Sequence, residues 1–240
     1  MLRAPSYFRY YTDVSGIPCT RDCNTGNYQD VIIGMASISK NYIDTLITSF
    51  KQKYPSYWDK KGNQLNKKEL ENIINFLDKN HVMMLTIIFE HKDWDKYRQM
   101  YPNETNFREK VMAILYFFIL KKLVKKKFIH EAVLDNDTNF GIFQCIICCK
   151  RLLNMYDYNI DITLGHREIN PELRFADWIA QARRKISIKH LSKYNNFIIL
   201  KNRLPHPLII LIFKSQKVIR SRLHSMQEPA SGSTSHSPSD

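Results

Sequence analysis

The sequence lacks any long hydrophobic run. Its 240 residues contain no stretch near the roughly 18 consecutive apolar residues that a membrane-spanning helix needs. The closest candidates are Val111–Leu120, which is followed by two lysines, and the short run Leu208–Phe213. The first residues carry no apolar segment followed by a small-residue cleavage site. We therefore expect neither a transmembrane segment nor a secretory signal.

Glycine and cysteine are scarce. With seven glycines and no glycine-rich loop, the chain shows no phosphate-binding loop, so we do not expect it to use ATP or a dinucleotide. Five cysteines, an odd number, give no disulfide framework and suit a reducing cytosol, which predicts a cytoplasmic protein. Two groups could suggest zinc: Cys19 with Cys23, and Cys145 with Cys148 and Cys149. No matched Cys/His pair completes either group, and the second lies in an apolar segment where reduced cysteine acts as a small hydrophobe.

Acidic residues are absent from residues 183–224, which hold eleven Lys or Arg, and the whole chain has a net charge of +13. This basic block favours a polyanionic partner, nucleic acid first and an anionic membrane surface second, although a solvated basic face explains the charge equally well. The last residues are rich in Ser and Pro, which predicts disorder. We expect a folded domain over residues 1–187, a basic extension over 188–225 and a disordered tail over 226–240.

Apolar periodicity predicts strands that alternate with helices, which is typical of an α/β or α+β sheet domain. The predicted strands are Tyr7–Asp13, Val31–Ile38, His81–Glu90, Phe128–Leu134 and Tyr158–Leu164. The predicted helices are Asn41–Lys53, one that begins at a capping box of Asn66 and Glu69, Asn106–Lys127, Phe140–Met155 and Asn170–Lys185. Phe197–Leu200 and Leu208–Phe213 could be short strands or poorly ordered apolar patches.

Three aspartates stand at positions of interest. Asp13 and Asp135 each end a predicted strand, and Asp177 lies in a helix that is apolar on most sides. Because ligands collect at strand ends in open sheets, the three carboxylates could converge and bind Mg²⁺ or Mn²⁺, whose pairs activate water in phosphodiester cleavage. Each aspartate alone is more simply explained as structural, because strand-end Asp residues often form turns and Arg184 could pair with Asp177.

Two short motifs carry a resemblance. Asp13-Val14-Ser15-Gly16 follows the first strand, and FADWIA at 175–180 lies near the end of the domain. Together they resemble a large uncharacterised family with a ribonuclease-H-like fold, whose members open with an Asp-x-Ser-Gly turn and close on a Leu/Ile-Ala-Asp-x-Ile-Ala helix. The resemblance covers about residues 5–187 and includes Lys60-Lys61-Gly62. It implies a mixed α/β sheet with three antiparallel first strands and a cluster of Asp13, Asp135 and Asp177.

Ribonuclease-H-like nucleases usually have a fourth acidic residue, and the resemblance leaves its identity open. Asp137 is a neighbour of Asp135, Glu168 precedes the last helix, and Glu69 is already explained as a helix cap. Val14 stands where the family often has Glu, which removes one possible ligand.

The leading hypothesis is a metal-dependent nuclease in which Asp13, Asp135 and Asp177 hold Mg²⁺ or Mn²⁺. Basic side chains would hold the phosphates without reading the base sequence. The residues expected in this role are Lys61, Arg183, Arg184 and Lys185. One alternative is a non-catalytic nucleic-acid-binding protein on the same fold. Another is a protein–protein adaptor that docks through Leu208–Phe213.

Overall fold

The computed structural model describes residues 8–16, 30–100, 106–123, 130–136 and 141–200. The chain divides into two compact units, residues 1–204 and 205–240, and every element described below belongs to the first. The predicted disordered tail, the segment Leu208–Phe213 and most of the basic extension lie outside the described residues.

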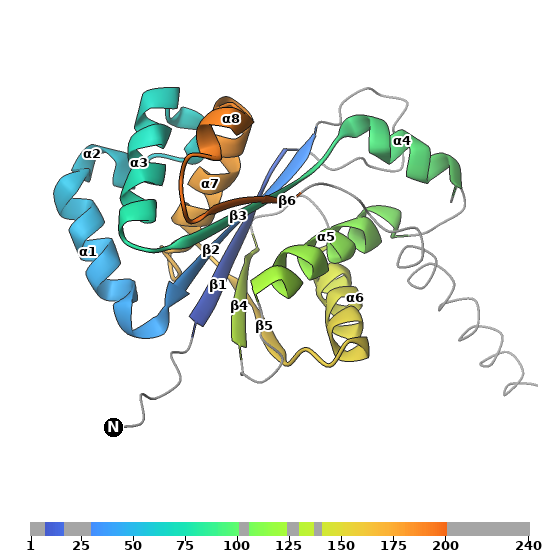
Figure 1. The fold of residues 1–240 in the computed structure, drawn as a ribbon. Coiled ribbons are helices and arrows are strands. Elements are labelled where there is room, and N and C mark those ends of the chain that lie inside the picture. The colour runs from blue at the N-terminus through green and yellow to red at the C-terminus, as the bar shows by residue number, and fades with distance from the viewer. Residues whose placement is uncertain (1–7, 17–29, 101–105, 124–129, 137–140, 201–240) are drawn as a thin grey trace, which may run out of the picture. The chain divides into compact units, whose positions relative to one another are not determined.

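Six strands form one mixed sheet in the order β5-β4-β1-β2-β3-β6 (Figure 1). The strands are β1 (Phe8–Ser15), β2 (Val31–Ser39), β3 (Met83–Phe89), β4 (His130–Asp135), β5 (Ile160–Gly165) and β6 (Phe197–Leu200). The first three pair antiparallel in succession, whereas β4 runs parallel to β1, β5 parallel to β4, and β6 parallel to β3. The prediction of a mixed α/β sheet that begins with three antiparallel strands is confirmed. Because β6 joins β3, the sheet includes residues beyond 187.

Helices cover both faces of this sheet (Figure 1). On one face lie α1 (Ile43–Lys53), α2 (Pro55–Trp58), α3 (Lys67–Lys79), α7 (Leu173–Lys185) and α8 (Ile188–Leu191), and on the other α4 (His91–Met100), α5 (Phe107–Leu123) and α6 (Ile142–Met155). Short 3₁₀ segments, Lys40–Tyr42 and Gly62–Gln64, precede α1 and α3. Of the helices that the structure describes, none combines the length and apolar character needed to cross a bilayer.

Most predicted helices are present with shifted ends. The capping box of α3 is confirmed, since Glu69 N donates to Asn66 Oδ1 at 3.0 Å and Asn66 N donates to Glu69 Oε2 at 2.8 Å. The last helix does not begin at Asn170, as predicted. Residues 170–172 form a turn in which Leu173 N donates to Asn170 O, and α7 begins at Leu173. Sequence analysis missed α4, because its polar sequence has few apolar residues at helical spacing.

The close approach of α7 to the sheet depends on small residues. A Cβ atom on Gly34 of β2 would lie 2.4 Å from Ala176 O and 2.6 Å from Ala180 N. Both are backbone atoms of α7, which cannot move aside as a flexible side chain would, so this position requires glycine. Gly34 also pairs with Asp13 across the β1–β2 ladder. The same contact therefore brings α7 next to the strand that carries Asp13.

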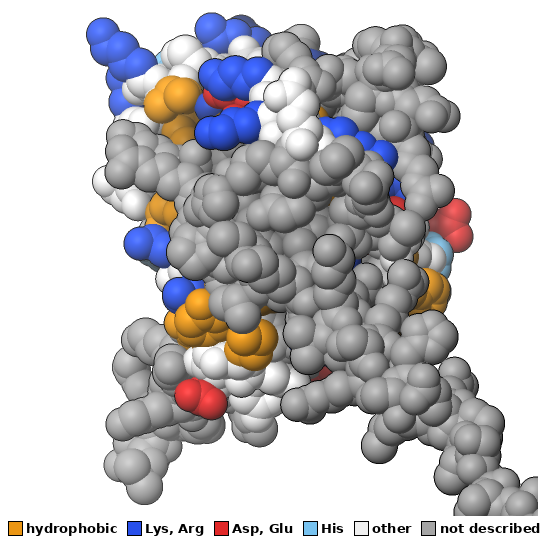
Figure 2. Space-filling model, turned by 90° about the vertical axis from the view of Figure 1, so that its right-hand side faces the viewer, with side chains coloured by type: hydrophobic (Ala, Val, Ile, Leu, Met, Phe, Trp, Pro, Cys, Tyr) orange, Lys and Arg blue, Asp and Glu red, His pale blue; other side chains and the backbone are white. Residues whose placement is uncertain are grey.

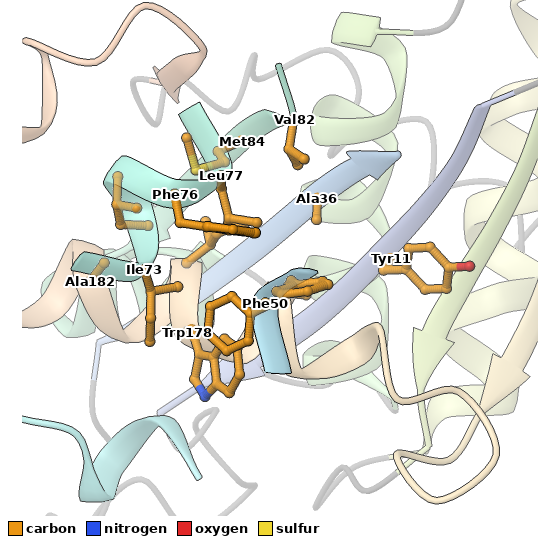
Figure 3. Packing of buried hydrophobic residues seen from close by; sticks show 14 of the residues in the cluster. Tyr11, Ala36, Phe50, Ile73, Phe76, Leu77, Val82, Met84, Trp178 and Ala182 are labelled. Atoms are coloured by element: carbon orange, nitrogen blue, oxygen red, sulfur yellow. The ribbon is translucent and has the colours of Figure 1, made fainter. Parts of the chain in front are cut away.

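On the face of the sheet covered by α1, α3 and α7, the hydrophobic core surrounds the ring of Phe50 (Figure 3). Phe50 stacks on Trp178 of α7 at a centroid distance of 5.1 Å, and it meets Phe76 of α3 and Phe175 edge-on at 5.1 and 5.6 Å. Its side chain is fully buried. One aromatic side chain thus joins α1, α3 and α7, and it fixes the helix on which Asp177 lies.

We expect Phe50→Ala to lower the free energy of unfolding by about 3–5 kcal/mol, because it leaves a cavity among fully buried rings. Phe143→Ala is the matched control: its side chain on α6 is 72% exposed, and its removal should change the free energy by less than about 0.5 kcal/mol. Urea unfolding followed by circular dichroism measures both. Equal effects of the two substitutions would contradict the role given to Phe50.

Candidate active site

Asp13 and Asp135 lie on two neighbouring parallel strands, near their carboxyl ends. Asp135 ends β4, whereas β1 continues for two residues beyond Asp13, to Ser15, and does not end at Asp13 as predicted. Thr12 of β1 pairs with Leu134 of β4, and each aspartate is the next residue along its strand. Both side chains are buried. Val14 N donates to Asp13 Oδ1 at 2.6 Å, which fixes the orientation of that carboxylate. The two strands thus bring two acidic groups together near their carboxyl ends.

Asp177 reaches the same place from α7. Gly62 N, in the loop before α3, donates to Asp177 Oδ2 at 2.8 Å, and the indole of Trp178 donates to Lys60 O at 3.2 Å. A Cβ on Gly62 would lie 2.8 Å from Asp177 Oδ1 and 2.6 Å from Gln181 Cγ, so a larger residue could not approach the helix as closely. The Lys60-Lys61-Gly62 segment is therefore a support for the Asp177 carboxylate.

A single arginine joins the three carboxylates. Arg167 Nη2 lies 2.6 Å from Asp13 Oδ2, its Nε lies 3.0 Å from Asp135 Oδ2, and its Nη1 lies 3.3 Å from Asp177 Oδ2. The sequence pattern predicts that the three aspartates could converge, but it does not indicate Arg167. The only available signal was its position directly after the strand next to β4.

The turn that carries Arg167 is fixed by the sheet. Gly165 ends β5 and pairs with Asp135 of β4, so the residues that follow Gly165 begin next to the Asp135 carboxylate. A Cβ on Gly165 would meet Val133 Cγ1 at 2.5 Å and Asn170 Oδ1 at 2.7 Å, which leaves room for glycine only. His166 is exposed on this turn, and its Nε2 lies 3.2 Å from Asn136 Nδ2.

One guanidinium is shared by three buried carboxyl groups, two of which have raised pKa values. Burial and the charge of Asp177 raise the pKa of Asp13 well above its usual range, and the opposing effect of Arg167 does not cancel this. Burial likewise raises the pKa of Asp177 despite Arg167 and the Gly62 N–H. Burial alone would lower the pKa of Arg167, but the three carboxylates more than compensate and raise it.

The basic residues of α7 have other partners. Arg184 does not pair with Asp177: its Nη2 donates to Ser15 O at 3.2 Å and to Asp30 O at 2.8 Å. Lys185 Nζ donates to the backbone oxygens of Asn63 and Leu65, and so it closes the loop before α3 onto α7.

Of the other two predicted phosphate ligands, Arg183 is half-buried, and burial lowers its pKa. Lys61 is exposed, directly before the glycine that contacts Asp177.

Neither Glu69 nor Glu168, the two candidates for a fourth acidic residue that the structure describes, joins the carboxylate cluster. Glu69 pairs with Lys60 at 2.7 Å in addition to capping α3. Glu168 is exposed next to Arg167, and Asp137 lies outside the described residues. A further acid, Glu109, is buried at the start of α5, where it pairs with Arg108 and accepts from Gly141 N.

Within the described ranges, no three His, Cys, Asp or Glu side chains are arranged to hold a metal ion as they stand. The three aspartates surround a guanidinium instead. The thiols of Cys145, Cys148 and Cys149 are buried in α6, and burial raises the pKa of Cys145 well above its usual range. Cys19 and Cys23 lie outside the described residues.

No protein-family model and no curated protein matches this chain. Solved structures do resemble it. A mutant of Bst-RNase HIII superposes with a TM-score of 0.50 at 14% identity, over 78% of this chain and 55% of the other, so the match spans about half of that protein. RNase HII of Archaeoglobus fulgidus, from its complex with PCNA, gives a TM-score of 0.49 at 12% identity, over 96% and 98% of the two chains. With the sheet order and strand directions described above, the likeness to Bst-RNase HIII shows that this chain has a ribonuclease-H-like fold.

Proposed function

We propose that this protein is a metal-dependent nuclease, or a related enzyme that acts on phosphodiester bonds. The observation that carries the proposal is the convergence of Asp13, Asp135 and Asp177 at one edge of a ribonuclease-H-like sheet. Carboxylate oxygens are the ligands that Mg²⁺ and Mn²⁺ prefer. Bst-RNase HIII, a protein of known structure that shares the fold, is named a ribonuclease.

The charge balance of the site fits a divalent cation. If all three carboxyl groups were ionised, the single charge of Arg167 would leave two negative charges uncompensated in a buried place. Burial first, and neighbouring carboxylates second, raise the pKa of Asp13 and of Asp177. A hard divalent cation supplies the missing charge together with a preference for oxygen ligands. The donor chemistry therefore fits, although the carboxylates now contact a guanidinium.

In this proposal, Asp13, Asp135 and Asp177 hold Mg²⁺ or Mn²⁺, which would lower the pKa of a bound water and stabilise the leaving oxygen. The Val14 and Gly62 N–H groups orient two of the carboxylates. Lys61 would contact a phosphate, and its exposure directly before Gly62, which binds Asp177, supports this role.

The surface charge also supports a polyanionic substrate. Figure 2 views the molecule from the side that carries α4, α5 and α6, and Lys and Arg side chains gather at the upper end of its described surface. Arg184 and Lys185, which bind backbone oxygens, serve here to hold the loops around the site.

A non-catalytic nucleic-acid-binding protein is the second candidate, and one specific observation favours it. Arg167 already contacts all three carboxylates, as a permanent structural counter-ion would. In that case, basic side chains alone would bind the polyanion, and metal would have no effect on the protein.

Metal titration separates the two candidates. We expect calorimetry to show Mn²⁺ and Mg²⁺ binding to the wild-type protein, with affinity reduced at least about tenfold in Asp13→Asn and in Asp177→Asn, because each loses an ionised ligand. Asp161→Asn is the matched control, since it removes an exposed carboxylate from the neighbouring strand β5 and should bind as the wild type does.

A cleavage assay follows on single-stranded and double-stranded DNA and RNA and on DNA–RNA hybrids. Metal-dependent cleavage that both substitutions abolish would establish the enzyme. If neither metal binds at millimolar concentration in the presence of nucleic acid, the catalytic proposal fails and the binding protein takes its place.

The raised pKa of Asp13 predicts a pH dependence of stability in metal-free buffer. A carboxyl group whose pKa is raised by folding loses its proton first in the unfolded chain, so folding stability falls as the pH rises between the two pKa values. From about pH 4, the ordinary Asp value, upward, Asp13→Asn should therefore gain stability relative to the wild type. The gain is about 1.4 kcal/mol for each unit by which folding raises the pKa.

Urea unfolding at a series of pH values with EDTA measures this difference. A difference in the free energy of unfolding that stays constant with pH would show that Asp13 is not perturbed in this way.

A further inference from the structure

We propose that Arg167 is a displaceable internal cation: a divalent metal competes with it for Asp13, Asp135 and Asp177, and the released guanidinium then binds a phosphate of the nucleic acid. This inference rests on the proposed metal site. It gives Arg167 two alternative partners, the three carboxylates in the absence of metal and a phosphate in its presence.

The geometry of the contact carries the first step. The three nitrogens of the guanidinium each face a different carboxylate, at 2.6, 3.0 and 3.3 Å. A guanidinium is planar and presents its donors in a fixed fork, so one side chain satisfies three acceptors from β1, β4 and α7 without rearrangement. An arginine that contacts three acidic groups from three elements substitutes for a cation that those groups would otherwise need.

The oxygens that Arg167 uses are those that a metal would need. Arg167 engages one oxygen of each aspartate, Oδ2 in every case. The second oxygen of Asp13 accepts the Val14 N–H, and Oδ2 of Asp177 also accepts the Gly62 N–H. A metal ion that bound these Oδ2 atoms would replace contacts that Arg167 makes there, and the two cations would repel each other at this distance. Binding of one must weaken binding of the other.

The exposure of the side chains indicates which group can leave. The carboxylate side chains are 3%, 1% and 10% exposed, whereas that of Arg167 is 21% exposed. The aspartates lie on two central strands and a packed helix, while Arg167 lies on the short turn between β5 and α7. Rotation of one partly exposed side chain opens the site and leaves the sheet and α7 in place.

The released guanidinium has a natural partner. It remains attached to the turn that follows Gly165, and Gly165 pairs with Asp135 across the sheet, so it stays beside the carboxylates. Arginine binds phosphate with the same fork that it uses for carboxylates. Metal and polyanion should therefore strengthen each other's binding, since the metal releases the arginine that the phosphate uses, and such coupling is reciprocal.

The test is a set of Mn²⁺ titrations by calorimetry, with and without a phosphorothioate DNA oligonucleotide that resists cleavage. The proteins are the wild type, Arg167→Gln and Arg167→Lys, with Arg151→Gln as a control that removes one positive charge from an exposed position on α6. Without DNA, Arg167→Gln should bind Mn²⁺ at least about tenfold more tightly than the wild type, a typical size for coupling between sites. Arg167→Lys should fall between the two, and Arg151→Gln should match the wild type.

With DNA present, Mn²⁺ affinity should rise in the wild type and change much less in Arg167→Gln. Equal Mn²⁺ affinities of the wild type and Arg167→Gln would overturn the competition while leaving the proposed metal site intact. Equal enhancement by DNA in both would overturn the phosphate role. If neither protein binds Mn²⁺ at millimolar concentration, both the inference and the proposed function fail.

Arg167→Gln leaves three buried carboxylates without a cation, so its folding is followed by circular dichroism. A variant that melts in EDTA and regains its fold with Mn²⁺ supports the inference, because the metal then replaces the guanidinium. A variant that stays unfolded in Mn²⁺, while Arg167→Lys folds and binds Mn²⁺ no more tightly than the wild type, overturns it.

Discussion

Three buried carboxylates in mutual contact with one guanidinium form the interaction on which the rest of this structure depends. Isolated carboxylates are costly to bury, and three of them near one another also repel. The surrounding elements hold them there nevertheless. Gly34 lets α7 approach β2 until backbone atoms are in contact, and Phe50 fixes α7 from the other side. The fold therefore stabilises a concentration of negative charge that is unfavourable in itself, and such concentrations are typical of functional sites.

The candidate site is rich in acidic groups, whereas the chain as a whole is basic. The chain carries a net charge of +13, yet the strand ends gather an excess of acid. A polyanion attracted by the basic surface would be repelled at the place where chemistry could occur. Any activity on nucleic acid must therefore include a step that neutralises the carboxylates, either by a bound cation or by protons. This requirement links the electrostatics of the surface to the occupancy of the site.

Strand ends and local motifs indicated that Asp13, Asp135 and Asp177 could converge, and the family resemblance implied the same cluster. The runs that end in Asp13 and Asp135, the apolar segment around Asp177 and the capping box at Asn66 each have a signal within a few residues. Arg167 has none, because its three partners lie on other elements and meet it only through the register of β4 with β5. The alternative that Arg184 pairs with Asp177 is not formed, because helix periodicity gives the face of a residue while its partner depends on which loop packs there. Local sequence pattern predicts helices and strands, but the contacts between distant side chains depend on how those helices and strands pack and pair.

The four charged groups come from segments far apart in the chain, and Arg167 and Asp13 are 154 residues apart in sequence. No fragment of the domain contains the site, since β1 supplies the first ligand and α7 the last. Contacts of this sequence separation form late and slowly in folding, because the closure of a long loop precedes any gain from them. A growing or partly unfolded chain consequently has no assembled cluster. Whatever activity these carboxylates support is confined to molecules that have completed folding.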